Sequence, residues 1–230
     1  MKAVIIAAGE GTRMRPLTYE TPKQLLRVCG KTLLAYVLEA LPAEISEVIM
    51  VVGYKGADIQ KFLGEEWHGK KVQYVWQARP QGTAHAMSLA KDLLVGEKFF
   101  LAGYADDIHG ADGVAALIAQ HRPCFMVAEV EDPRKFGVIE TDAMGKITTF
   151  EEKPEHPKSN LISSGFFVLP IEIFDYPAPP RENGEEYIPD RVARMIQDGH
   201  EFYTECSTQW IPIGYPQDLQ KAEDILCPKK

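Results

Sequence analysis

The stretch AAGEGTRMRPLTYETPKQLL, residues 7–26, combines glycines with basic side chains at a spacing that suits the binding of an anion. Gly9 and Gly11 let the backbone bend and approach a ligand without interference from side chains. Arg13 and Lys23 can donate charge-assisted hydrogen bonds to phosphate oxygens. We therefore predict a phosphate-binding turn that follows a short apolar strand.

Two common nucleotide-binding motifs do not fit this region. A dinucleotide fingerprint needs a third glycine where Met14 stands. Gly30-Lys31-Thr32 resembles the end of a Walker A loop, but the glycine required five residues before Gly30 is Leu25. The segment from Met1 to Lys31 carries six basic and two acidic residues in a chain whose formal net charge is −8. Positive charge is thus concentrated where the glycine turn lies.

Three further segments carry side chains that could act on a nucleotide or a sugar. Asp106 and Asp107 follow an apolar run, where a carboxylate can hold Mg²⁺ at the carboxyl edge of a sheet. The Gln77 amide offers a donor and an acceptor, which suit uracil or thymine, and Gly82 leaves room for the ring. The segment EEKPEHPK, residues 151–158, taken alone is more typical of a solvated charge run than of a site.

The composition bounds the class of protein. A chain of 230 residues that is 45% hydrophobic can bury a substantial core. Its net charge of −8 argues against a general nucleic-acid or anionic-membrane binder, and no apolar run reaches 18 residues. The four cysteines are far apart and form no C-x-x-C pair, so we expect neither a metal knuckle nor disulfides, and a reduced, cytoplasmic protein.

Short β-branched runs alternate with helical periodicity along the first half of the chain, which predicts an α/β fold with a mixed, mostly parallel central sheet flanked by helices. Apolar residues at 86, 89, 90 and 93 predict one amphipathic helix after Gly82. We interpret the proline-rich segment 176–189 as an exposed insertion or lid, and we expect a last helix to begin at Pro216.

The order of these motifs resembles that of the sugar-1-phosphate nucleotidylyltransferases. The resemblance rests on GEGTRMRPLT with TPKQLL, on QARPQGTAHAM, on the aspartates after LAGYA, on FEEKP, and on SNLISSG, and it covers nearly the whole chain. The form of the second motif is similar to that of N-acetylglucosamine-1-phosphate uridylyltransferases, and glucose-1-phosphate thymidylyl- and uridylyltransferases are also similar. The resemblance implies a single Rossmann-like nucleotidyltransferase domain over residues 1–230, without the β-helix acyltransferase domain that is fused to some relatives.

The resemblance also implies roles for individual residues. The groups that would contact the reacting phosphates are Arg13 and Lys23, and the metal ligand would be Asp106, with Mg²⁺ as the cofactor. The nucleotide would be bound by Ala8, Gly9, Gly11, Thr12, Gln77, Gly82 and Thr83. The sugar phosphate would be bound by Gly137, Glu152, Lys153 and Ser164.

One motif departs from the pattern of the family. Relatives carry W-x-D-x-G near the C-terminus, and that aspartate is a second protein ligand to the metal. Here Pro212 stands at that position, and proline has no side-chain donor or acceptor. Three alternatives follow: Mg²⁺ is held by Asp106, phosphates and water, or Asp107 or Asp218 replaces the missing ligand, or activity is impaired.

The expected reaction joins a nucleoside triphosphate, UTP or dTTP, to a hexose 1-phosphate, and releases pyrophosphate. A catalytically silent subunit that binds a nucleotide sugar is an alternative, which the proline at position 212 keeps open. A cytidylyltransferase for a phosphorylated alcohol is another, which the EEKP and SSG matches disfavour. The expected partners are the two substrates, with no nucleic acid or membrane, and the resemblance leaves a homo-oligomer open because relatives form dimers and tetramers.

Overall fold

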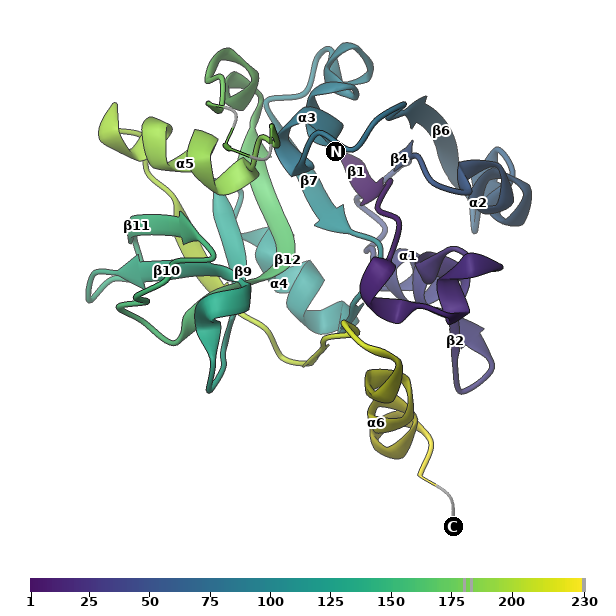
Figure 1. Cartoon of the computed structure of the whole chain (residues 1–230). Coiled ribbons are helices and arrows are strands. Elements are labelled where there is room, and N and C mark those ends of the chain that lie inside the picture. The colour runs from purple at the N-terminus through teal and green to yellow at the C-terminus, as the bar shows by residue number, and fades with distance from the viewer. Residues whose placement is uncertain (180, 183, 229–230) are drawn as a thin grey trace.

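The strand β1 (Lys2–Ala7) lies inside a ten-stranded mixed sheet that forms the middle of the molecule (Figure 1). The computed structural model describes residues 1–179, 181–182 and 184–228. The other strands of this sheet are β4 (Glu47–Val52), β5 (Glu66–Trp67), β6 (Lys70–Trp76), β7 (Phe99–Tyr104), β9 (Cys124–Glu129), β10 (Gly137–Thr141), β11 (Ile147–Glu152), β12 (Leu161–Pro170) and β13 (Tyr203–Cys206).

The strand order is β11-β10-β12-β7-β1-β4-β6-β5, with β9 paired to β12 and β13 paired to β9. Strands β7, β1, β4 and β6 are parallel neighbours, whereas β12 runs antiparallel to β7, β9 and β10. Two short strand pairs lie outside the sheet: β2 (Arg27–Val28) with β3 (Lys31–Thr32), and β8 (Ile108–His109) with β14 (Trp210–Ile211). The mixed α/β architecture that the sequence predicted is confirmed.

Helices cover both faces of the sheet. They are α1 (Leu33–Glu39), α2 (Gly56–Leu63), α3 (Thr83–Ser88), α4 (Ala111–Ala119), α5 (Ile188–Gln197) and α6 (Pro216–Leu226). Ala3, Ile5 and Ala7 of β1 pack with α1, α2 and α4 on one face, while Val4 packs with α3 and α5 on the other. Because successive side chains of a strand point to opposite faces, β1 contributes to both cores. Burial on both faces also explains why its sequence is almost entirely apolar.

Short 3₁₀ helices complete the chain, and three of them shape the loop after β1. They are η1 (Thr12–Met14), η2 (Leu17–Tyr19), η3 (Lys23–Leu25), η4 (Lys91–Leu94), η5 (Pro133–Lys135) and η6 (Ile171–Asp175). A third, smaller core joins this loop to the C-terminal helix through Met14, Val28, Ile213 and Ala222. The loop that carries the glycines is therefore packed against the last element of the chain.

Two expectations from the sequence are corrected. The single amphipathic helix after Gly82 is divided: α3 ends at Ser88, and the chain continues through turns into η4. The hydroxyl of Ser88 donates to the carbonyl of Ala84, and the next backbone bonds, such as Leu89 N to Ala86 O, close 3₁₀ turns. Apolar periodicity does not distinguish an α-helix from this tighter continuation.

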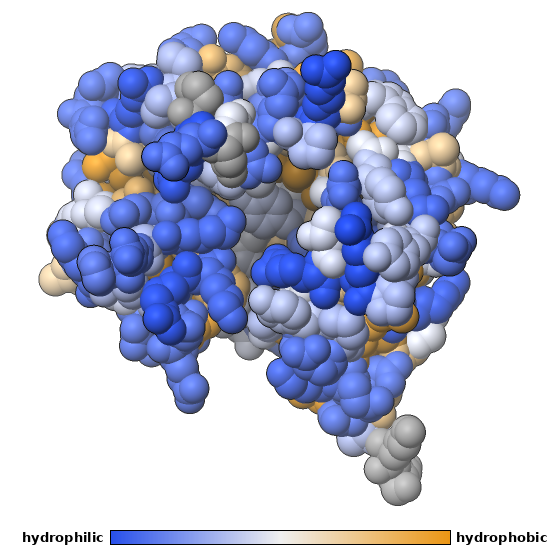
Figure 2. Space-filling model, in the orientation of Figure 1, coloured by the Kyte–Doolittle hydropathy of each residue, from blue (hydrophilic) through white to orange (hydrophobic). Residues whose placement is uncertain are grey.

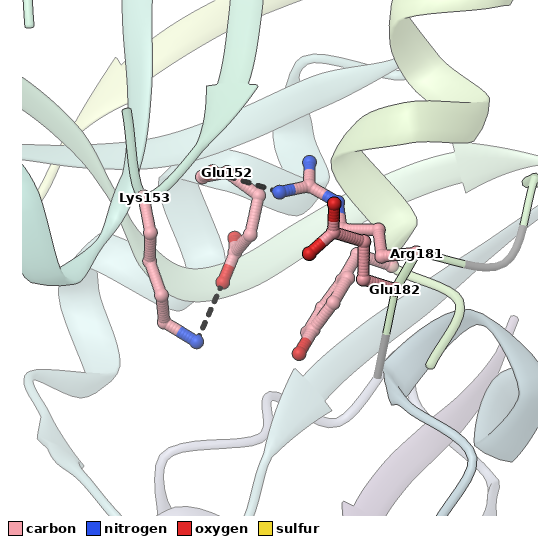
Figure 3. A pocket seen from close by; sticks show the side chains of 5 residues that line it. Glu152, Lys153, Arg181 and Glu182 are labelled. Carbon is pink, nitrogen blue, oxygen red and sulfur yellow. Dashed lines mark hydrogen bonds and ion pairs between the residues drawn. The ribbon is translucent and has the colours of Figure 1, made fainter. Parts of the chain in front are cut away.

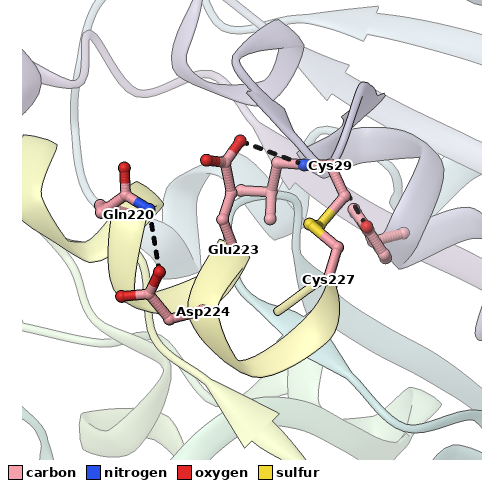
Figure 4. The surroundings of a disulfide bond; sticks show 7 residues. Cys29, Gln220, Glu223, Asp224 and Cys227 are labelled. Carbon is pink, nitrogen blue, oxygen red and sulfur yellow. Dashed lines mark hydrogen bonds between the residues drawn. A yellow bond between two sulfur atoms is a disulfide. The ribbon is translucent and has the colours of Figure 1, made fainter. Parts of the chain in front are cut away.

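The second correction concerns the cysteines. Cys29 and Cys227 form a disulfide across 198 residues of sequence, whereas we expected none (Figure 4). Cys29 lies in the turn between β2 and β3, and Cys227 caps the C-terminal end of α6, where Glu223 accepts a hydrogen bond from the Cys29 amide at 3.3 Å. Cys124 and Cys206 are free thiols. The fold brings together two cysteines that lie near opposite ends of the sequence.

Candidate active site

The site lies at the carboxyl edge of the parallel strands. Ala7 at the end of β1 is in register with Val52 of β4, Val52 with Trp76 of β6, and Ile6 with Tyr104 of β7. The loops that begin after these residues must therefore emerge along one edge, which is where α/β sheets bind ligands. In the space-filling view this face is hollowed between the β10–β11 side and the N-terminal loop, and hydrophilic side chains surround the hollow (Figure 2).

The glycine turn begins as the sequence predicted. Gly9, Thr12 and Arg13 are exposed, and Gly9 has no neighbour that a Cβ would meet within 4 Å. Gly11 has a φ of 63°, and a Cβ there would lie 3.1 Å from the Cβ of Lys23. Glycine is favoured here because the backbone is left-handed and because the turn passes close to Lys23.

Lys23 links the glycine turn to the first aspartate. Its ammonium group lies 2.6 Å from the Asp106 carboxylate, and its side chain is only 7% exposed. A lysine buried to this degree needs a charged partner, because the desolvation of an unpaired ammonium is costly. This ion pair joins the loop after β1 to the loop after β7, although 83 residues separate them.

Asp107 has a different role from Asp106. Its two carboxylate oxygens accept hydrogen bonds from the Trp210 indole at 3.0 Å and from the Ile213 backbone at 2.9 Å. Burial, and then the charge of Asp106, raise the pKa of Asp107 above its ordinary value. Asp107 therefore holds the C-terminal segment that contains Pro212.

The other alternative ligand, Asp218, is also occupied. One of its oxygens accepts from the backbone amides of Gly214 and Tyr215 at 3.0 and 2.8 Å, where it caps α6, and the other accepts from Lys221 at 3.1 Å. No cluster of three or more His, Cys, Asp or Glu suited to a metal occurs among the residues that the structure describes. Asp106 is 35% exposed at its side chain, so an oxygen-ligated Mg²⁺ fits here if phosphates and water supply the other ligands.

The segment expected to bind the base, residues 77–87, is organised around Gln77 and Gly82, and we call it the base segment. The Gln77 amide nitrogen lies 3.3 Å from the Gly82 carbonyl oxygen and 3.0 Å from His85 Nδ1. Gly82 has a φ of 89°, and a Cβ there would lie 2.2 Å from the backbone oxygen of Glu186. A side chain at position 82 would thus displace the chain near Glu186, a contact that the sequence did not reveal.

Tyr104 interacts with one member of each of the three groups of residues that the sequence assigned separately. The Thr83 side chain hydrogen-bonds its hydroxyl, and the carboxylates of Glu152 and Asp106 are near enough to act on it electrostatically. Burial, followed by these two charges, raises the pKa of Tyr104. Sequence reasoning missed this residue, although it ends the apolar strand two positions before Asp106.

Three of the four residues assigned to the sugar phosphate lie together at one end of the paired strands β10 and β11. Gly137 of β10 is in register with Glu152 of β11, and the Glu152 carboxylate lies 3.1 Å from the Lys153 ammonium. A pocket of about 360 Å³ is lined by Glu152, Lys153, Arg181, Glu182 and Tyr187 (Figure 3). Ser164 on β12 is 2% exposed, and its hydroxyl has no hydrogen-bond partner among the described residues.

Two more cations face the C-terminal segment. The Arg13 guanidinium lies 5.5 Å from the centre of the Tyr215 ring, and the Lys135 ammonium lies 5.7 Å from the same centre. Neither cation forms a salt bridge within the described part of the chain. Both are within the range of a cation–π contact, and Tyr215 therefore connects the glycine turn with η5, which directly precedes β10.

Comparisons with known proteins agree with this arrangement. The family described as nucleotidyl transferase matches residues 2–228. The UTP–glucose-1-phosphate uridylyltransferase AglF of Haloferax volcanii is 33% identical over 98% of this chain and 96% of its own length. A glucose-1-phosphate thymidylyltransferase of Streptomyces antibioticus is 33% identical over 98% of this chain and 64% of its own length.

A solved structure from Bacillus anthracis, assigned as a glucose-1-phosphate thymidylyltransferase and bound to sucrose, superposes with a TM-score of 0.88 at 26% identity, over 100% of this chain and 96% of that one. None of the described helices is long and apolar enough to cross a lipid bilayer. The chain belongs to the nucleotidyl transferase family, among its sugar-1-phosphate nucleotidyltransferases.

Proposed function

We propose that the protein transfers a nucleotidyl group from UTP or dTTP to a hexose 1-phosphate, giving a nucleotide sugar and pyrophosphate. The observation that carries this proposal is the ion pair of Lys23 with Asp106 at 2.6 Å, beside a tyrosine, Tyr104, that also contacts Thr83 and lies near Glu152. These contacts gather phosphate-, base- and sugar-binding candidates at one edge of the sheet.

The chemistry needs little from the protein besides charge and alignment. An oxygen of the sugar 1-phosphate attacks the α-phosphorus of the triphosphate, and the bond to pyrophosphate breaks. The attacking oxygen is already ionised at neutral pH, so no general base is required. The barrier comes mainly from the repulsion of two polyanions and from the entropy of aligning them.

Three cations address that repulsion. Arg13 and Lys23 would contact the triphosphate, and Lys153 would contact the sugar phosphate. One pair of unit charges at 4 Å is worth about 4 kcal/mol at an effective dielectric near 20. Mg²⁺ held by Asp106 and by phosphate oxygens would supply further neutralisation of charge when bound.

A nucleotide and sugar panel tests the proposal. Pyrophosphate release is measured with UTP, dTTP, CTP and GTP, each against glucose 1-phosphate and N-acetylglucosamine 1-phosphate. We expect turnover with UTP or dTTP, because the Gln77 amide can pair with a uracil or thymine edge. If only CTP or GTP supports turnover, the assignment of the base is wrong.

A silent subunit that binds a nucleotide sugar is the second candidate, and one specific observation favours it. Both carboxylates near Pro212 that could replace the missing ligand, Asp107 and Asp218, are occupied by backbone or indole N–H groups. If no pair turns over while UDP-glucose still binds by calorimetry, this candidate is correct. A Pro212→Asp variant should then gain Mg²⁺-dependent turnover, because it restores the carboxylate.

A further inference from the structure

A short segment of the proline-rich region contacts the base side of the site. We name residues 181–182 and 184–188 the strap. The Glu186 amide donates to the carbonyl of Gln81 at 2.9 Å, and the Ala84 amide donates to the carbonyl of Glu186 at 2.9 Å. These two backbone hydrogen bonds also bring Glu186 close to Gly82. The strap therefore pairs with the base segment through its backbone.

The same strap is fastened on the sugar side by one arginine (Figure 3). Arg181 donates from Nη1 to the backbone oxygen of Glu152 at 3.2 Å. Its Nε and Nη2 donate to the two oxygens of Asp190 at 3.1 and 2.7 Å, in the bidentate geometry that arginine favours. The hydrogen bonds to Asp190, and then the charge of Asp190, raise the pKa of Arg181. One side chain thus connects the strap, helix α5 and the end of β11.

Two aromatic and cationic contacts extend this connection into the pocket. The Arg181 guanidinium lies 5.2 Å from the centre of the Tyr187 ring, and the Lys153 ammonium lies 5.3 Å from it. On the other side of the strap, Arg191 of α5 is 6% exposed and lies 3.4 Å from the Glu186 carboxylate. The strap is therefore held by α5 at two points, between the base segment and the residues proposed to bind the sugar phosphate.

We propose that Arg181 is a positioning residue, which sets the placement of Glu152 and Lys153 for the sugar 1-phosphate by fastening the strap to α5 and β11. This inference rests on the proposed function. The side chain acts through Asp190 and the Glu152 carbonyl, because three of its donors are committed to them. The nucleotide side depends less on Arg181, since the strap reaches Gln81 and Ala84 through backbone bonds.

Steady-state kinetics of Arg181→Gln, Arg181→Lys and Asp190→Asn test the inference, with the best substrate pair of the wild-type protein. We expect the KM for the sugar 1-phosphate to rise about tenfold in each variant, as the loss of charge-assisted hydrogen bonds implies. The KM for the nucleoside triphosphate and kcat should change less than about threefold. Arg181→Lys should not restore the KM for the sugar 1-phosphate, because lysine lacks the planar guanidinium that donates two parallel hydrogen bonds.

Two controls separate positioning from a general loss of structure. Arg122→Gln removes an exposed arginine that lies on Tyr203, away from the site, and should leave all constants unchanged. The double variant Arg181→Gln/Asp190→Asn should be no worse than Arg181→Gln alone, because that single change already breaks the contact with Asp190. An additive double variant, or equal rises in both KM values, would overturn the inference.

The outcomes also distinguish this inference from the proposed function. A wild-type protein that turns over no substrate pair overturns the proposed function. A wild-type protein that turns over normally, with Arg181→Gln and Asp190→Asn indistinguishable from it, overturns the positioning role alone. Thermal unfolding of each variant accompanies the kinetics, and a split between the two KM values with an unchanged Tm supports the inference.

Discussion

The surroundings of Lys23 explain both how a charged lysine can be buried and how it can act on a ligand. Lys23 is held by a partner at 2.6 Å, yet Asp106 keeps a side-chain exposure of 35% and can face a ligand. The pair therefore places a cation and a carboxylate together at the edge where triphosphate and metal would meet. Removal of the lysine leaves a carboxylate that water can still reach.

We predict that Lys23→Ala lowers kcat/KM at least about a hundredfold, because the cation contacts charge that develops in the transition state. The folded state should lose about 1 to 3 kcal/mol, since only one ion pair is broken. Pyrophosphate release and thermal unfolding measure the two effects. Lys31→Ala is the matched control, because Lys31 also pairs with a carboxylate at 2.6 Å, in Glu39, but lies outside the site.

For single residues, the sequence indicated which side chains could bind a ligand, but it did not indicate which side chains they contact in the fold. The glycines, Lys23 and Asp106 could be singled out because their types and spacing fit phosphate and metal binding. That Asp107 holds the Trp210 indole, or that Tyr104 lies among Thr83, Glu152 and Asp106, depends on packing between segments far apart in the chain. No local pattern encodes such contacts.

Among the elements, the small pair of β8 and β14 contains a buried histidine. His109 is 5% exposed, packs edge-on against Phe166 at 4.8 Å, and its Nδ1 has no hydrogen-bond partner among the described residues. Burial lowers the pKa of His109 to about 4, although the nearby charge of Asp106 opposes this shift. The imidazole is therefore neutral in the folded protein at neutral pH.

This histidine predicts a dependence of stability on pH. Above pH 6.5 His109 is neutral in both the folded and the unfolded protein, so its full contribution to stability is present. As the pH falls from 6.5 to about 4, His109 takes up a proton in the unfolded chain but not in the folded protein. The free energy of unfolding should fall by about 3 kcal/mol across that window from this residue alone. Urea titrations of the wild type and of His109→Phe measure the difference.

In His109→Phe the fall in the free energy of unfolding that His109 causes should disappear, because phenylalanine does not titrate and its ring still packs on Phe166. His156→Gln is the control, since His156 is exposed and should leave the slope as in the wild type. Equal slopes in all three proteins would contradict the account of His109.

The elements themselves were the part that the sequence predicted best. Strands and helices alternate along the first half of the chain as predicted, and α6 begins at Pro216 as predicted, because burial on one or both faces imposes a period on the sequence. The division of the helix after Gly82 was not predicted, because i→i+3 and i→i+4 bonding both suit the same apolar spacing.

Considered as a whole, the molecule is closed by a covalent link between its N-terminal loop region and its last helix. The disulfide of Cys29 with Cys227 adds to the contact of Glu223 with the Cys29 amide (Figure 4). Sequence reasoning could not find it, because the two cysteines become neighbours only after α6 packs on the β2–β3 turn. The spacing of cysteines indicates disulfides only where a local framework exists.

Reduction of this bond should lower stability without a change of fold. A cross-link over 198 residues removes entropy from the unfolded chain, and a loss of about 3 to 5 kcal/mol is expected when it opens. Calorimetric Tm values with and without a dithiol, and for Cys29→Ser, measure this loss. Cys206→Ser is the matched control, because Cys206 is an exposed free thiol, and its Tm should match the wild type.

The same bond makes most of the polypeptide a macrocycle, since only the residues before Cys29 and after Cys227 lie outside the ring. A single proteolytic nick anywhere between these two cysteines would open the ring and leave one molecule rather than two fragments. On an unreduced denaturing gel such a nicked protein should migrate as one band of full mass, and it should separate into two pieces only after a thiol is added.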